Sequence, residues 1–191
     1  LMKSYAPEME LRQGENGAPS EYRNTKALRQ YEWSELTQAK WALRRMLGDL
    51  GRDIPTSIFS IIDMKYPDEM NRKGLLFSNE DQTVGHRKQA YFAVQNLASL
   101  FDNSLKRIKD FSYETNCIQK NSAFAFQKLT DESDILVIWL HTNRPVDYNS
   151  TTPVDVKFKG IKFRNPVLID IRTGVVFEIP RDSYDQKGSL F

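Results

Sequence analysis

The chain has 191 residues, enough for one large domain or two small ones. Hydrophobic residues make up 40% and charged residues 27%, the proportions of an ordinary globular protein. The formal net charge of +2 gives no electrostatic reason to expect nucleic acid or an anionic membrane as the partner. The single cysteine, Cys117, excludes an intrachain disulfide, and no apolar run is long enough to cross a bilayer.

The first stretch with a clear pattern is residues 8–17. Residues 8–13 alternate polar and apolar side chains, which predicts a strand. The strand is followed by Gly14-Glu15-Asn16-Gly17, dense in residues that favour turns. Because a strand and a site-like loop come within seventeen residues, we expect the natural protein to begin further upstream.

Residues 34–101 predict helix, strand and helix in turn. Ser34 is a suitable N-cap for a helix that ends before Gly51. Residues 56–62 form a mostly apolar run typical of a buried parallel strand. A long loop over 65–84 then leads to a helix over about 86–101. With the strand at 8–13, the order β-α-β-α predicts parallel strands and an α/β architecture whose edges stay open.

The pattern changes near residue 106. Six β-rich ranges follow with short polar breaks, and Arg172-Thr173-Gly174 suits a hairpin turn between the last two. These ranges are 109–116, 122–129, 134–142, 154–164, 166–171 and 174–180. We therefore expect an α/β part over 1–106 and a small antiparallel β-sandwich over 107–191.

Three stretches resemble the C-terminal part of a retaining glycoside hydrolase, from the clan built on a (β/α)8 barrel. Residues 13–17 look like the end of barrel strand seven, where the clan places its glutamate nucleophile. Residues 57–63 look like strand eight, and residues 88–97 resemble the last barrel helix through the pattern Lys-x-Ala-Tyr-x-Ala-x-x-x-Leu. The closing residues 166–174 are similar to the final hairpin of an appended β-domain.

The resemblance implies that the chain holds the last two β/α units of the barrel and the β-domain, with Glu15 as the catalytic nucleophile. Retaining hydrolysis needs two carboxyl groups about 5–5.5 Å apart. Active sites of such barrels lie at the carboxyl ends of the strands, where Glu15 would stand. No strand-four segment precedes it, so we expect the acid/base residue outside this chain and little or no hydrolysis by the chain alone. The alternative for Glu15 is an ordinary loop glutamate.

Several polar and aromatic residues are candidates for substrate binding: Asn16, Tyr22, Tyr31, Trp33 and Asp63. Asn16 can bond a sugar or turn the chain, and the aromatic residues can stack on sugar rings or pack the loop. Asp63 can bind a hydroxyl, position Arg72 or Lys73, or form a structural ion pair. Asn71, Arg72 and Lys73 are further binding candidates in the long loop.

The sequence predicts neither a cofactor nor a metal site, because no cluster of histidine and cysteine has the spacing of metal ligands. The expected partner is a carbohydrate substrate, with neither nucleic acid nor a membrane, and the open barrel edge predicts self-association. Another class of function stays open: a non-catalytic β module that binds carbohydrate or protein, for which residues 8–101 are scaffold.

Overall fold

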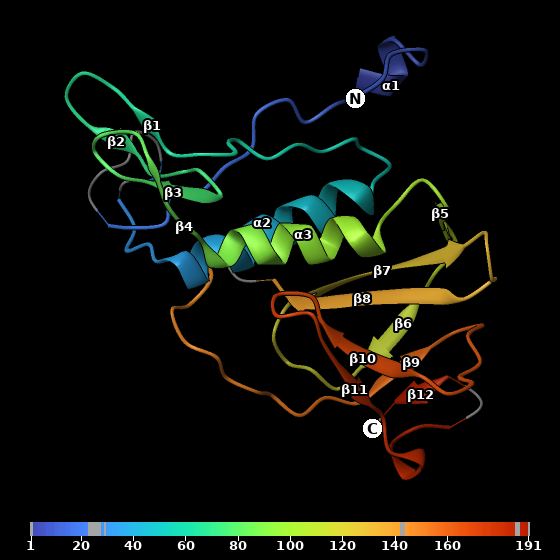
Figure 1. The fold of residues 1–191 in the computed structure, drawn as a ribbon. Coiled ribbons are helices and arrows are strands. Elements are labelled where there is room, and N and C mark those ends of the chain that lie inside the picture. The colour runs from blue at the N-terminus through green and yellow to red at the C-terminus, as the bar shows by residue number, and fades with distance from the viewer. Residues whose placement is uncertain (1, 23–27, 29, 142–143, 186–187, 191) are drawn as a thin grey trace.

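The computed structural model describes residues 2–22, 28, 30–141, 144–185 and 188–190, and it is a mixed α+β protein. Two long helices pack together beside several small antiparallel sheets (Figure 1). A short helix, α1 (Met2–Tyr5), lies near the N-terminus, apart from the rest of the fold in Figure 1.

Helix α2 (Glu35–Leu50) begins and ends where the sequence predicts. The Ser34 hydroxyl accepts a hydrogen bond from the Thr37 backbone N–H at 3.2 Å, and the Thr37 hydroxyl accepts one from the Ser34 N–H at 2.8 Å. This reciprocal pair satisfies two backbone donors that the first turn leaves free. Gly51 follows directly as the C-cap.

Helix α3 (Gln89–Leu100) begins three residues later than the predicted position 86. Residues 84–87 instead pair with residues 76–78 as an antiparallel hairpin. The two helices run in the same direction: Ala39 and Ala90 share one hydrophobic cluster near the N-terminal ends, and Leu47 and Leu97 share another near the C-terminal ends (Figure 1).

The long loop expected over 65–84 is two small hairpins. In the first, β1 (Met64–Lys65) pairs with β2 (Met70–Asn71). In the second, β3 (Leu76–Ser78) pairs with β4 (Val84–Arg87).

Each of the six predicted β ranges in the second half overlaps an observed strand, and the strands at residues 105–107 and 189–190 lie outside the predicted ranges. The strands of this half are β5 (Leu105–Arg107), β6 (Tyr113–Thr115), β7 (Asn121–Lys128), β8 (Asp134–Leu140), β9 (Val156–Phe158), β10 (Val167–Asp170), β11 (Val175–Glu178) and β12 (Ser189–Leu190). They form three antiparallel sheets in the orders β5-β7-β8, β12-β9-β6 and β10-β11. The predicted turn before Gly174 is confirmed, because this glycine joins β10 to β11 with a φ of +77°. A one-turn 3-10 helix, η1 (Arg181–Ser183), lies between β11 and β12.

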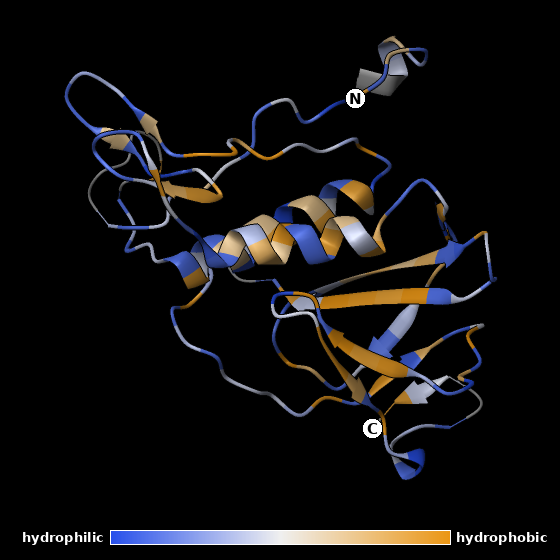
Figure 2. Cartoon of the chain, in the orientation of Figure 1, coloured by the Kyte–Doolittle hydropathy of each residue, from blue (hydrophilic) through white to orange (hydrophobic). Residues whose placement is uncertain are grey.

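The main hydrophobic core joins the two halves of the chain. Leu47 of α2 and Leu97 of α3 pack in one cluster with Phe126 of β7 and Val137 of β8. Figure 2 shows that β8 is among the most apolar segments. The division at residues 106 and 107 stays a prediction, since this cluster contains side chains from both sides of it.

The expected strands at 8–13 and 56–62 are wrong as regular elements: neither range contains a named strand. Across the described ranges the structure has no barrel, and every pair of named strands is antiparallel. A buried parallel strand needs hydrogen-bonding neighbours on both edges. Residues 13–16 have backbone partners only in residues 55–59 among the described residues, which is too few for a regular ladder.

Candidate functional site

The loop that carries Glu15 lies beside residues 55–59 and runs in the same direction. The Gln13 N–H donates to the Pro55 carbonyl at 2.9 Å, and further along the Phe59 N–H donates to the Asn16 carbonyl at 2.7 Å. Between these two bonds the Ser57 hydroxyl donates to the Gln13 carbonyl at 2.9 Å. The two segments are thus adjacent and parallel without forming a continuous ladder.

Gly17 makes this close approach possible. A Cβ atom at this position would lie 2.0 Å from the carbonyl oxygen of Phe59, a separation that no side chain tolerates. At Gly14, on the other side of Glu15, a Cβ atom would meet nothing within 4 Å. Only the second glycine is therefore required by packing.

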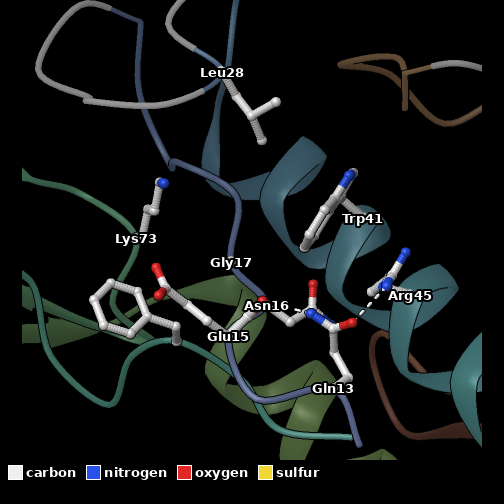
Figure 3. A pocket seen from close by; sticks show the side chains of 9 residues that line it. Gln13, Glu15, Asn16, Gly17, Leu28, Trp41, Arg45 and Lys73 are labelled. Atoms are coloured by element: carbon white, nitrogen blue, oxygen red, sulfur yellow. Dashed lines mark hydrogen bonds between the residues drawn. The ribbon is translucent and has the colours of Figure 1, made fainter. Parts of the chain in front are cut away.

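A cavity of about 420 Å³ opens where the two segments meet (Figure 3). Its walls come from the Glu15 loop, from helix α2, from Phe59 and from the loop between β2 and β3. The lining residues are Gln13, Glu15, Asn16, Gly17, Leu28, Trp41, Arg45, Phe59 and Lys73. The Glu15 residue is exposed. Its carboxylate has no hydrogen-bond or ion-pair partner in the part of the chain that the structure describes.

The helix wall of the cavity is held by polar contacts. Arg45 donates from Nη2 to Gln13 Oε1 at 2.8 Å, and its Nε lies 3.3 Å from Asp49 Oδ2 (Figure 3). Gln13 in turn donates from its side-chain amide to the Glu15 carbonyl. The backbone of the Glu15 loop is therefore tied to α2 on one side and to residues 55–59 on the other.

Two buried donors also line the cavity. Asn16 is 4% exposed, and its amide nitrogen has no acceptor among the described residues. Lys73 is 9% exposed, and Figure 3 shows its side chain on the same side of the cavity as the Glu15 carboxylate. The cavity therefore combines the Glu15 carboxylate with two donor side chains, and the amide of Asn16 has no acceptor among the described residues.

Behind this wall lies a buried ion cluster centred on Asp63. The Asp63 carboxylate accepts hydrogen bonds from Lys88 Nζ at 2.6 Å and from Arg72 Nη1 at 3.2 Å. The backbone N–H groups of Gly74 and Ser78 donate to the same carboxylate at 2.9 and 3.3 Å. With four donors on two oxygens, Asp63 has the contacts of a structural ion pair.

Lys88 is completely buried and crosses from this cluster to the Glu15 loop. Its ammonium also donates to the Ser20 hydroxyl at 2.8 Å and to the Arg72 carbonyl at 3.2 Å, which gives it three acceptors. Burial lowers the pKa of the Lys88 ammonium, while the bond to Asp63 and its charge act in the opposite direction. The guanidinium of Arg72 lies over the Phe77 ring at 4.2 Å.

The structure brings together only part of the predicted site. Glu15 and Asn16 share the cavity, whereas Tyr22, Tyr31, Trp33 and Asp63 do not line it. Tyr22 and Tyr31 are exposed. Trp33 is buried, packs edge-on against Tyr31 and donates from its indole nitrogen to the Leu28 carbonyl at 2.9 Å. The substrate-binding roles assigned to these residues stay predictions.

Sequence reasoning missed the helix wall, Trp41 and Arg45. Both lie on α2, and nothing in the helical periodicity distinguishes a face that lines a cavity from one that faces open solvent. Lys88 was noted only as the first residue of a helix pattern.

The resemblance implies that the clan's acid/base motif, an Asn-Glu dipeptide, is absent from the chain, but this expectation is wrong because the dipeptide is present at Asn79-Glu80. It lies in the turn between β3 and β4, where the Asn79 N–H donates to the Thr83 carbonyl at 2.9 Å. Glu80 is exposed, and neither residue lines the cavity. This dipeptide therefore does not supply a second carboxylate beside Glu15.

The described residues contain no group of three or more histidine, cysteine, aspartate or glutamate side chains placed to hold a metal ion. Among the described helices, none has both the length and the apolar character to span a membrane. No family model matches the chain, and no curated protein matches it.

Proposed function

We propose that the chain is the C-terminal part of a retaining glycoside hydrolase and that Glu15 is its nucleophile. In this proposal residues 1–106 are the last two β/α units of a (β/α)8 barrel, and residues 107–191 are an appended antiparallel β-domain. One observation carries the proposal: the Glu15 carboxylate stands in an open cavity and, within the described residues, is not used by any ion pair. A carboxylate in a structural salt bridge on a convex surface would have argued for the binding module instead.

The arrangement around Glu15 supports the barrel. Residues 13–16 and 55–59 lie side by side in the same direction, and the next helix after the first segment is α2. After the second segment the chain first forms the hairpins β1–β2 and β3–β4 and then helix α3. The two helices also run in the same direction, as consecutive β/α units require. Glu15 is at the carboxyl end of the first segment, which is the end where barrels of this type place their catalytic groups.

The chemistry proposed for Glu15 has two steps. One oxygen of its carboxylate bonds to the anomeric carbon while the bond from that carbon to the leaving oxygen breaks. A carboxylic acid from the preceding part of the protein gives its proton to the leaving oxygen. The same group then takes a proton from water, and the hydroxide oxygen displaces Glu15 to release the sugar with its original anomeric configuration.

The test is to produce the chain joined to the sequence that precedes it in its gene, and to compare Glu15→Gln with Glu10→Gln. Both substitutions replace an exposed glutamate in the same segment, but Glu10 does not line the cavity. We expect Glu15→Gln to lower kcat for aryl glycosides by several orders of magnitude, because the covalent step is lost. Glu10→Gln should leave kcat unchanged, and the first product seen by NMR should retain its anomeric configuration.

The 191-residue chain by itself should show little or no hydrolysis, because the proposal places its acid/base residue upstream. Robust turnover by the chain alone, kept after Glu15→Gln, would contradict both parts of the proposal. An inverted product would exclude a glycosyl-enzyme intermediate. A joined protein that binds sugar without hydrolysing any would favour the binding module.

A further inference from the structure

Lys73 lines the cavity that contains Glu15 and has no ion-pair partner among the described residues. Lys73 is only 9% exposed. In the described ranges its ammonium has neither a hydrogen-bond acceptor nor a carboxylate within ion-pair distance. A buried charge is costly unless it is paired. An unpaired ammonium at the wall of a cavity therefore indicates that something entering the cavity supplies the counter-charge.

The backbone that carries Lys73 is fixed on both sides. Before it, Arg72 is bound through its guanidinium to Asp63 at 3.2 Å, and its carbonyl accepts the Ser20 N–H at 3.0 Å. After it, the Gly74 N–H donates to Asp63 Oδ1 at 2.9 Å. The carbonyl of Lys73 itself accepts the Ser60 N–H at 3.3 Å. These contacts fix the backbone of Lys73 at the wall of the cavity.

The donors at this wall select the kind of ligand. Lys73 can only donate, and the orphan atom of Asn16 is also a donor, the amide nitrogen. Figure 3 shows the Asn16 side chain turned toward Gln13 and helix α2, so Lys73 is the donor on the same side as the Glu15 carboxylate. A neutral hydroxyl would leave the lysine charge unpaired, whereas an oxyanion pairs with it.

We propose that Lys73 binds an anionic substituent of the sugar, a carboxylate or a sulfate, so that the substrate is an acidic glycoside. The inference rests on the proposed function, because it places this substituent in the cavity of the nucleophile. Asp63 is then a positioning residue: it holds the residues on either side of Lys73 and leaves substrate contact to the lysine.

The direct test is binding to the 191-residue chain, followed by NMR or calorimetric titration. The probes are methyl β-glucuronide, glucose 6-sulfate and, as the neutral reference, methyl β-glucoside. We expect at least one acidic probe to bind about tenfold or more tightly than the neutral sugar, the factor that one charge-assisted hydrogen bond supplies. Preference for the glucuronide or for the sulfate identifies which oxyanion the cavity takes.

Lys73→Met keeps the aliphatic length and removes the charge, and it should bring the acidic and neutral sugars to equal affinity. Lys73→Arg should keep the preference. Lys65→Met is the matched control, since Lys65 is exposed and bonds only to the Glu80 carbonyl among the described residues. Thermal unfolding of each variant verifies that it is folded. Equal affinities in the original chain, no binding of any probe, or an acidic preference that survives Lys73→Met would overturn the proposal.

The Glu15→Gln variant separates this inference from the proposed function. Removing the like charge of Glu15 should tighten binding of the acidic sugar while it abolishes hydrolysis by the joined protein. Hydrolysis that survives Glu15→Gln, with acidic sugar still bound through Lys73, would end the nucleophile proposal and keep the Lys73 site. Loss of hydrolysis in Glu15→Gln, with unchanged sugar binding in Lys73→Met, would support Glu15 as the nucleophile and overturn the Lys73 site.

Discussion

Arg72 and Lys73 are neighbours in the chain, and the structure treats their charges in opposite ways. The guanidinium of Arg72 joins a buried cluster in which Asp63 has four donors and Lys88 has three acceptors. The ammonium of Lys73 lines a cavity in which it and the Glu15 carboxylate have no ion-pair partner among the described residues. The first region uses its charges to hold the loops together. The second leaves its charges available, which is the property expected of a binding or catalytic site.

The largest effect is expected when the buried ion cluster around Asp63 loses its carboxylate. Asp63→Asn leaves Arg72 and Lys88 buried without their counter-charge, and we expect the free energy of unfolding to fall by about 3–5 kcal/mol. Urea denaturation measures this change. Asp68→Asn, at an exposed aspartate of the same segment, should stay within about 0.5 kcal/mol of the original chain. Equal effects at the two positions would mean that the cluster does not hold this region.

A smaller effect is expected where the Glu15 loop meets residues 55–59. In Gly17→Ala the new methyl group would overlap the Phe59 carbonyl, so the loop must move, at a cost of about 1–3 kcal/mol. Gly14→Ala adds the same methyl group on the other side of Glu15, where nothing lies within 4 Å. Chemical denaturation should therefore separate the two variants. If Gly14→Ala lowered the free energy of unfolding more than Gly17→Ala, the close approach of Gly17 to Phe59 would be contradicted.

The smallest effect concerns the alignment of the two helices. Glu35, in the first turn of α2, accepts the Gln89 N–H at the start of α3 at 3.1 Å and lies 2.6 Å from His86 Nε2. Glu35→Gln keeps an acceptor and removes the negative charge from the N-terminal ends of two helices. Because the site is partly exposed, we expect a loss of only about 0.5 kcal/mol at pH 7.

The control for this change is Glu32→Gln, at an exposed glutamate just before α2, which should not alter the free energy of unfolding measurably. The loss at Glu35 should shrink in high salt, because the interaction of a partly exposed charge with helix termini is screened. A salt-independent loss would point to altered packing in place of electrostatics.

Local signals in the sequence predicted several elements but not the arrangement of the first half of the chain, where the expected parallel strands are absent as regular elements among the described residues. Ser34 and Gly51 delimit α2 because capping depends on residues within one turn. Side-chain patterns alone predict six of the strands of the second half but neither β5 nor β12. The predicted start of α3 is wrong because residues 84–87 pair with β3, an interaction that no local pattern reveals. The expected parallel strands were wrong as regular elements because a strand depends on its neighbours as well as on its own residues.

The sequence indicates only part of the cavity. Glu15 and Asn16 line it, and Lys73 comes from the loop after Asp63 that the sequence offers as a source of binding residues. The roles of these residues stay predictions. The sequence could not show that Arg72 turns inward while Lys73 lines the cavity, since both are basic residues in one polar loop. Nor could it show that Lys88 is buried, because its cluster joins four segments that are distant in sequence.

The most direct measurement of the central claim is covalent trapping of Glu15. The protein, joined to its preceding sequence, is incubated with 2-deoxy-2-fluoroglycosyl fluorides of several sugars, including a glucuronosyl fluoride, and digested for mass spectrometry. The 2-fluoro substituent slows both steps by destabilising the oxocarbenium-like transition state, and the good fluoride leaving group restores only the first step, so the glycosyl-enzyme accumulates. We predict one added sugar on the peptide that contains Glu15, and none in Glu15→Gln. An unmodified Glu15 with every sugar, or an adduct on another carboxylate, would contradict the assignment of Glu15 as the nucleophile.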